Sequence, residues 1–177
     1  MNNADDVVTC HGITQDPKTN SFMMIMDYAE NGSLRKHLNN SFNSMNWNKK
    51  LDILRWIAHG LTEIHCKGLI HHDFHCGNIL SVSQSSIYIT DLGLCQPANV
   101  KTSQNENKKI YGVLPYVAPE VLRGKEYTQA SDIYGFGVIA YELCTGLPPY
   151  HDIAHEEHLA IRICQGLRPK SNYKILN

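Results

Sequence analysis

The chain has 177 residues, a formal net charge of −1 and 42% hydrophobic residues, a composition that fits one soluble domain with a real core. Its balanced charge favours neither nucleic acid nor a membrane as a partner, and its polar start and short apolar runs predict no signal peptide and no membrane span. Six cysteines without a C-x-x-C pair fit reduced thiols, so we expect a cytoplasmic location.

Two strands are expected first, at residues 7–14 and 21–27. The Asp-Pro-Lys-Thr-Asn segment between them is strong turn chemistry, which predicts a hairpin. Ser33 follows an Asn-Gly pair and can cap a short helix over residues 34–38.

A polar loop is predicted over residues 39–46, followed by a long helix. Apolar side chains recur at helical spacing from Trp47 to about Cys66, and Gly68 is placed to end that helix.

A second hairpin is predicted from strands at 78–82 and 87–91, with Ser-Gln-Ser-Ser as the turn. Antiparallel pairing about that turn would set Asn78 opposite Asp91, so that the two side chains share the open end of the hairpin.

The last third combines a long loop with two helices. Residues 91–120 are expected to be loop-like, with a polar middle at 101–109, and a loop of that length inside a compact domain is usually functional. Residues 131–144 predict a helix that is apolar nearly all round and therefore buried, and a last helix is expected over 153–165.

Three residues in this frame carry chemistry, namely Asp73, Asn78 and Asp91. Phosphoryl transfer needs a carboxylate that orients and deprotonates a hydroxyl, and oxygen ligands that hold Mg²⁺ on the phosphates. An Asp, an Asn five residues later and a second Asp across a hairpin meet that requirement in residue type and order.

These motifs, with others in the same order, resemble the protein kinase family, in the style of its tyrosine-kinase-like group. The matching segments are His71-His72-Asp73 with Asn78 (catalytic loop), Asp91-Leu92-Gly93 (D-F-G segment), Ala118-Pro119-Glu120 (A-P-E) and Asp132–Gly137 (start of the central helix). The resemblance implies an α+β, protein-kinase-like fold over residues 1–177. Residues 1–28 would end the small lobe and form the hinge, and residues 29–177 would form the helical large lobe without its final helices.

The activity implied by the resemblance is transfer of the ATP γ-phosphate to a Ser, Thr or Tyr hydroxyl of a protein substrate, with Mg²⁺. Asp73 would be the catalytic base, His75 would stand where a phosphate-contacting Lys is expected, and Asn78 and Asp91 would bind Mg²⁺ and ATP.

The resemblance also assigns nucleotide-binding and supporting residues. Met26 would be the gatekeeper, Asp27 and Ala29 would offer backbone groups to adenine, and Leu80 would lie under the base. Among the supports, His71 would pack beneath Leu92, and Asp132 would hold the backbone of the catalytic loop.

Some residues depart from the family pattern. His72 replaces an Arg that pairs with a phosphate on the activation segment, and imidazole cannot offer that permanent bidentate clamp. We therefore expect phosphorylation of Thr102, Ser103 or Tyr111 to give little switching. Val113 replaces a Thr that would contact both the catalytic Asp and the Lys expected at position 75. Because position 75 is His, the Thr and the Lys are replaced together.

Other family features have no counterpart in the sequence. It has no G-x-G-x-x-G, its only lysine before the hinge is Lys18 in a turn, and no partner for Glu120 follows Arg168-Pro169. These observations predict a kinase domain cut at both ends.

Two alternatives belong to other classes. The first is a non-catalytic interaction module. The second is a zinc site built from His72 and His75 with Cys66 or Cys76, although no two-plus-two ligand spacing supports it. The histidines at 151 and 155 surround no Glu in metalloprotease spacing, and we interpret them as a solvated face.

Overall fold

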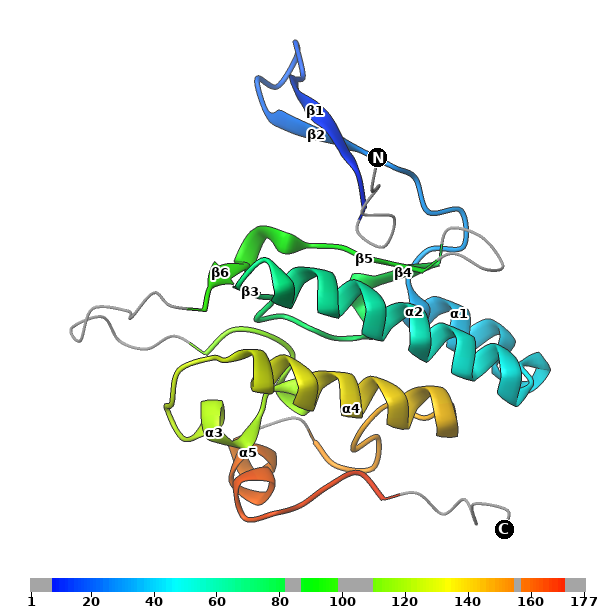
Figure 1. Ribbon diagram of the computed structural model, residues 1–177, viewed down its shortest axis with the longest axis vertical. Coiled ribbons are helices and arrows are strands. Elements are labelled where there is room, and N and C mark those ends of the chain that lie inside the picture. Colours follow the sequence, from blue (N-terminus) through cyan, green and yellow to red (C-terminus); the bar gives the residue numbers. More distant parts are fainter. Residues whose placement is uncertain (1–7, 82–86, 99–109, 155–156, 171–177) are drawn as a thin grey trace.

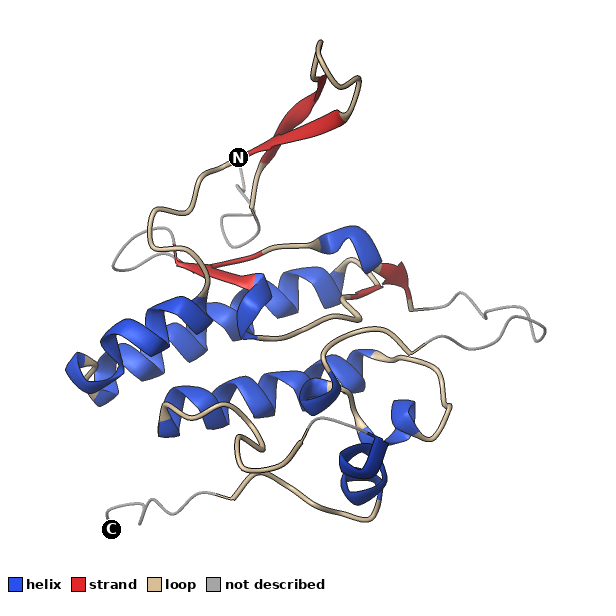
Figure 2. Cartoon of the chain, turned by 180° about the vertical axis from the view of Figure 1, so that it is seen from behind, coloured by secondary structure: helices blue, strands red, loops and turns tan. Residues whose placement is uncertain are grey.

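The computed structural model describes residues 8–81, 87–98, 110–154 and 157–170. A hairpin stands apart from the helices in both views, and the helical body lies below it (Figures 1 and 2). The main elements are β1 (Cys10–Gln15), β2 (Phe22–Met26), α1 (Leu34–Ser41), α2 (Trp47–Cys66), β4 (Ile79–Ser81), β5 (Ile87–Ile89), α4 (Gln129–Thr145) and α5 (Glu157–Cys164). The others are β3 (Leu69–Ile70), β6 (Gln96–Pro97), α3 (Pro119–Leu122) and 3₁₀ turns at Phe42–Ser44, Cys76–Asn78, Leu92–Leu94 and Leu114–Tyr116. This mixture confirms the expected α+β class.

The hairpin β1–β2 confirms the first pair of predicted strands, with slightly different ends. Its turn is closed by the Asp16 backbone N–H, which donates to the Ser21 carbonyl at 2.9 Å. Every residue of both strands is exposed, including Phe22 at 78% and Ile13 at 70%. The hairpin is therefore held by its own hydrogen bonds and contributes little to the core.

Helix α1 begins where the cap was predicted, because the Ser33 side chain accepts from the Lys36 backbone N–H. It continues to Ser41 and leads into the 3₁₀ turn at Phe42–Ser44, so the loop predicted over residues 39–46 was largely wrong. Leu38 is buried in the core, and the half-buried Phe42 packs against the same core. These contacts keep the chain helical through polar residues for which the sequence predicted a loop.

Helix α2 matches the predicted bounds. Asn46 caps its start, Gly68 follows its end with φ 71°, and Ile57 and Leu61 lie in the core. Leu51, one of the apolar residues at helical spacing, is 58% exposed, because the buried face of the helix passes through Lys50 and Ile53 instead.

Helix α4 is the central helix, with Ile139 and Leu143 fully buried in the cluster that also includes α2, β4 and β5. Its predicted burial is confirmed on most faces, while Ile133 is 54% exposed. Among the described residues α5 is shorter than predicted, and Ile153 lies in a turn instead of the helix.

The hairpin β4–β5 corrects the predicted register by one residue. Ile79 pairs with Ile89, and the Asn78 carbonyl accepts from the Thr90 N–H at 2.9 Å, so Asn78 faces Thr90 and not Asp91. The observed register places Ile79 and Ile89 on one buried face, and in a sheet buried on one side this fixes the pairing. The predicted turn residues 83–86 lie outside the described residues.

Within the described residues, no helix is both long enough and apolar enough to cross a membrane.

Candidate active site

The loop from β3 to β4 is held from below by one carboxylate. The backbone N–H groups of His71 and His72 donate to the two oxygens of Asp132, at 2.8 and 3.2 Å. Asp132 is buried in the first turn of α4, and His65 from the last turn of α2 also contacts it at 2.9 Å. The expected support of the loop by Asp132 is confirmed, while the contribution of His65 was not predicted.

His71 is fully buried and neutral. Its Nε2 lies 3.0 Å from the Thr90 carbonyl and must donate to it, while its Nδ1 accepts from the Asp73 backbone N–H at 3.3 Å. Burial lowers the pKa of His71, in keeping with these two bonds, which suit only the neutral ring. The ring packs edge-on against Phe74, with centroids 5.4 Å apart. Its expected packing beneath Leu92 stays a prediction.

Three of the predicted catalytic residues come together. The Asn78 amide donates to the Asp73 carbonyl at 3.0 Å and to its Oδ2 at 3.2 Å, so Asn78 fixes the carboxylate and the loop at once. His75 Nδ1 accepts from the Gly77 N–H at 2.9 Å, which leaves the proton on Nε2, 3.2 Å from Asp73 Oδ1.

The two oxygens of Asp73 differ in their surroundings. Oδ2 is bonded to Asn78, whereas Oδ1 is buried and, among the described residues, has His75 beside it without a well-aligned hydrogen bond. The adjacent His75 ring lowers the pKa of Asp73. Asp73 is therefore ionised at neutral pH, and within the described residues its Oδ1 accepts no well-aligned hydrogen bond.

Asp91 follows β5 by two residues and adopts a left-handed backbone with φ 59°. Asp91 is exposed. It directly follows Thr90, whose backbone N–H donates to the Asn78 carbonyl at the end of the hairpin. Because Asp73 engages the Asn78 amide nitrogen, the predicted metal ligand of this residue would be its amide oxygen. One amide oxygen and one carboxylate match the oxygen ligands of Mg²⁺, which takes its others from water and phosphate.

The segment that follows the predicted hinge runs beside β4. Ser33 forms an antiparallel bridge with Leu80, and the Ser81 N–H donates to the Gly32 carbonyl at 2.9 Å. This contact places Leu80 next to the segment that contains Ala29, whose carbonyl also accepts from the Gly32 N–H at 3.0 Å.

The other two predicted nucleotide residues lie at the base of the first hairpin. Met26 ends β2 and is 45% exposed, and the Asp27 carboxylate contacts His11 Nε2 at 2.7 Å, a contact that lowers the pKa of Asp27. Within the described part of the chain, no hydrogen bond or ion pair joins either residue to the catalytic loop.

A buried charged network under the site was not predicted. Glu142, fully buried in α4, pairs with Arg35 from α1 and accepts from the Tyr116 hydroxyl, which in turn accepts from Arg35 at 2.7 Å. Burial raises the pKa of Glu142, and Arg35 and Tyr116 act against that change. A lone Glu within an apolar helix was the available sequence signal, since a buried carboxylate needs a partner.

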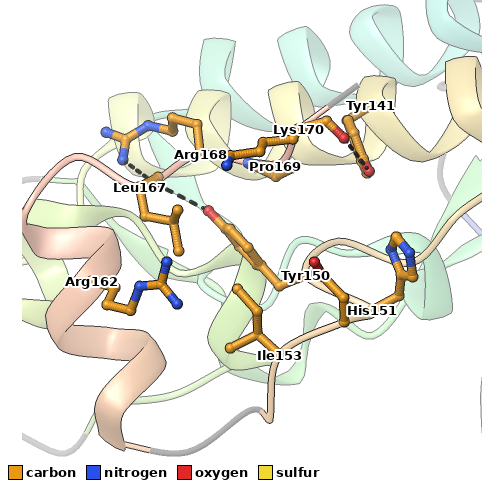
Figure 3. Close-up of a pocket in the computed structure, with 10 residues that line it drawn as sticks. Tyr141, Tyr150, His151, Ile153, Arg162, Leu167, Arg168, Pro169 and Lys170 are labelled. Atoms are coloured by element: carbon orange, nitrogen blue, oxygen red, sulfur yellow. Dashed lines mark hydrogen bonds between the residues drawn. The ribbon is translucent and has the colours of Figure 1, made fainter. Parts of the chain in front are cut away.

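A cavity of about 300 Å³ lies away from the catalytic loop, between Tyr150, Arg162 and Leu167 (Figure 3). It includes none of the predicted site residues. Nor does the described part of the chain bring three His, Cys, Asp or Glu side chains together as metal ligands, so the zinc alternative gains no support from geometry.

The sequence is similar to those of known protein kinases. The profile of the family described as protein tyrosine and serine/threonine kinase matches residues 1–175. A probable serine/threonine-protein kinase of Dictyostelium discoideum is 29% identical over 171 residues, covering 93% of this chain and 12% of the relative. The probable serine/threonine-protein kinase roco5 of the same organism is 33% identical, covering 92% of this chain and 6% of the relative. Serine/threonine-protein kinase ste20 of Aspergillus fumigatus is 37% identical, covering 72% and 15%. The chain thus spans 6% to 15% of the length of these relatives.

Proposed function

Because this chain belongs to the protein tyrosine and serine/threonine kinase family, we propose that its site transfers the γ-phosphate of ATP to a serine or threonine hydroxyl of a protein substrate. The observation that carries the proposal is the Asp73 carboxylate, with one oxygen fixed by Asn78 and the other buried without an aligned hydrogen bond. The relatives described as serine/threonine kinases favour Ser and Thr over Tyr as acceptors.

In this mechanism Asp73 Oδ1 orients the substrate hydroxyl and accepts its proton as phosphate is transferred. Asn78 holds the carboxylate in the required direction, and Asp132 keeps the loop backbone in place. Asn78 and Asp91 would hold the Mg²⁺ ion, which would neutralise charge on the phosphates, and ATP would supply the transferred phosphoryl group.

In this proposal His75 has a different role from the Lys that the family has at this position. Its ring is engaged with Gly77 and Asp73, so in the free site it supports the base instead of reaching outward. Met26, Asp27 and Ala29 would line the adenine site from the hinge, and Leu80 would lie against the base. We place the protein in the cytoplasm, without nucleic acid or membrane as partners.

Nucleotide binding is tested by thermal unfolding with Mg²⁺-ATP. A ligand that binds only the folded state stabilises it by about 2.7 kcal/mol at 100 times its Kd. We expect Mg²⁺-ATP to raise the Tm, Asp91→Asn to remove most of the Mg²⁺-dependent part, and the exposed-residue control Asp152→Asn to leave it intact. No Tm shift at millimolar Mg²⁺-ATP would contradict the proposal and favour a non-catalytic interaction module.

A further inference from the structure

One phenol hydroxyl holds the backbone of a segment that lies over the proposed base. The Tyr127 hydroxyl accepts from the Tyr111 backbone N–H at 2.9 Å and donates to the Tyr111 carbonyl at 2.5 Å. Both main-chain groups of one residue are therefore bonded by a single side-chain oxygen. Burial raises the pKa of Tyr127, so the hydroxyl keeps its proton, and with it the second bond, at neutral pH.

The ring of Tyr127 is fixed by the residue that replaces the family's Arg. The rings of His72 and Tyr127 meet edge-on, with centroids 4.5 Å apart. His72 Nδ1 must donate to the Leu94 carbonyl, 2.7 Å away, and its backbone N–H donates to Asp132. His72 is thus held through its backbone N–H by the buried Asp132 carboxylate, and its ring contacts the ring of Tyr127.

The clasped residue precedes Gly112, which lies close to the catalytic loop. A Cβ on Gly112 would come within 3.2 Å of the His72 carbonyl and 3.4 Å of Asp73 Oδ1. The backbone at Gly112 therefore forms one wall beside the Asp73 oxygen that lacks an aligned hydrogen bond. This backbone thus lies beside the oxygen that the proposed mechanism assigns to the substrate hydroxyl.

We propose that Tyr127 is a positioning residue that clasps Tyr111 and thereby holds the Gly112 wall against Asp73 without a phosphate. The phosphate clamp expected of an Arg is replaced by a continuous set of contacts from Asp132 through His72 and Tyr127 to Tyr111. The role in catalysis rests on the proposed phosphotransfer, whereas the clasp itself is a property of the fold.

The test compares Tyr127→Phe with a matched control in the full chain. Phe keeps the ring against His72 and loses only the hydroxyl. Tyr141→Phe is the control, because it also loses one hydroxyl-to-carbonyl bond, to Lys170 at 3.1 Å, at the distant cavity (Figure 3). The readouts are amide hydrogen exchange at Tyr111 and Gly112, Tm, and separate KM and kcat values for dephosphorylated casein and for ATP.

We expect Tyr127→Phe to speed exchange at Tyr111 by about fivefold, since a lost hydrogen bond is worth about 1 kcal/mol. The KM for casein should rise about fivefold or more, with the KM for ATP within about twofold of wild type. The control should leave exchange at Tyr111 and both KM values unchanged. Phosphatase treatment should not alter wild-type activity.

Two results would overturn the proposal. Unchanged exchange at Tyr111 in Tyr127→Phe would show that the Tyr127 hydroxyl does not hold Tyr111. An equal loss in every kinetic constant together with a lower Tm would show that Tyr127 has only a structural role. If wild type and control both failed to transfer phosphate while exchange at Tyr111 still accelerated, the proposed function would fall and the clasp would stand.

Discussion

The Asp73 carboxylate has two neighbours that impose different conditions on its oxygens. Asn78 bonds Oδ2 and the Asp73 carbonyl, which fixes the direction of the side chain. His75, itself anchored by the Gly77 N–H, lies beside Oδ1 and favours the ionised form. A base fixed in this way loses little freedom when a substrate hydroxyl arrives, and such preorganisation is what phosphoryl transfer requires of the protein.

At the residue scale, His71 gives a prediction about pH. Its pKa is lowered in the folded state from an ordinary 6.5, so between that lowered value and 6.5 the unfolded chain binds more protons. The free energy of unfolding should therefore fall as the pH drops below 6.5. His71→Gln, which can still donate to Thr90, should reduce this dependence in urea denaturation between pH 5.5 and 7.5. Identical slopes for wild type and variant would contradict the assignment.

A second prediction at this scale separates two glycines of α4. A Cβ at Gly135 would lie 2.8 Å from the Phe74 carbonyl, whereas one at Gly137 meets nothing within 4 Å. Gly137→Ala should stabilise the protein by about 0.5–1 kcal/mol through helix propensity. Gly135→Ala should destabilise it by about 1–2 kcal/mol, because the clash outweighs that gain. Equal effects in chemical denaturation would refute the close approach of α4 to the catalytic loop.

At the scale of elements, the buried pair of Arg35 and Glu142 joins α1 to α4. Glu142→Gln leaves the guanidinium without its counter-charge, and we expect a loss of about 3 kcal/mol, at the lower end of the usual range because Arg35 is 29% exposed.

The double variant Arg35→Met/Glu142→Leu provides the control. It removes both charges and should recover part of the stability lost in Glu142→Gln, because neither charge is then left buried without its partner. A loss below about 1 kcal/mol in Glu142→Gln would show that the pair does not hold α1 against α4.

Sequence reasoning predicted the elements whose signals are local. The bounds of α2 followed from apolar spacing and Gly68, and the start of α1 followed from Ser33. The register of β4–β5 and the length of α1 were missed, because each depends on which side chains the core buries. The contact between His72 and Tyr127 was missed for the same reason, since neither residue carries a signal of the other.

The candidate site shows the same division. The order of its residues was enough to predict the catalytic loop, and the structure brings Asp73, His75 and Asn78 into contact. The oxygen of Asp73 without an aligned bond, and the support from His65 and Tyr127, depend on tertiary geometry. The assigned roles in ATP and Mg²⁺ binding remain predictions.

At the scale of the whole molecule, the structure divides into a packed helical body and an exposed hairpin. The apolar residues of β1 and β2 face solvent on both sides, and Phe22 and Met24 are 78% and 58% exposed. The hairpin should therefore open at a low free-energy cost. We expect its amides to exchange at least about 100-fold faster than those of α2 and α4, and equal protection would contradict this division.

Phosphate transfer from ATP to casein by wild type and by Asp73→Asn tests the central claim most directly. A general base contributes about 10²–10⁴ to the rate, so the variant should lose at least about 100-fold in kcat while its Tm stays near that of wild type. Asp52→Asn, which alters an exposed carboxylate on α2, should retain full activity. Equal transfer by wild type and Asp73→Asn would contradict the account.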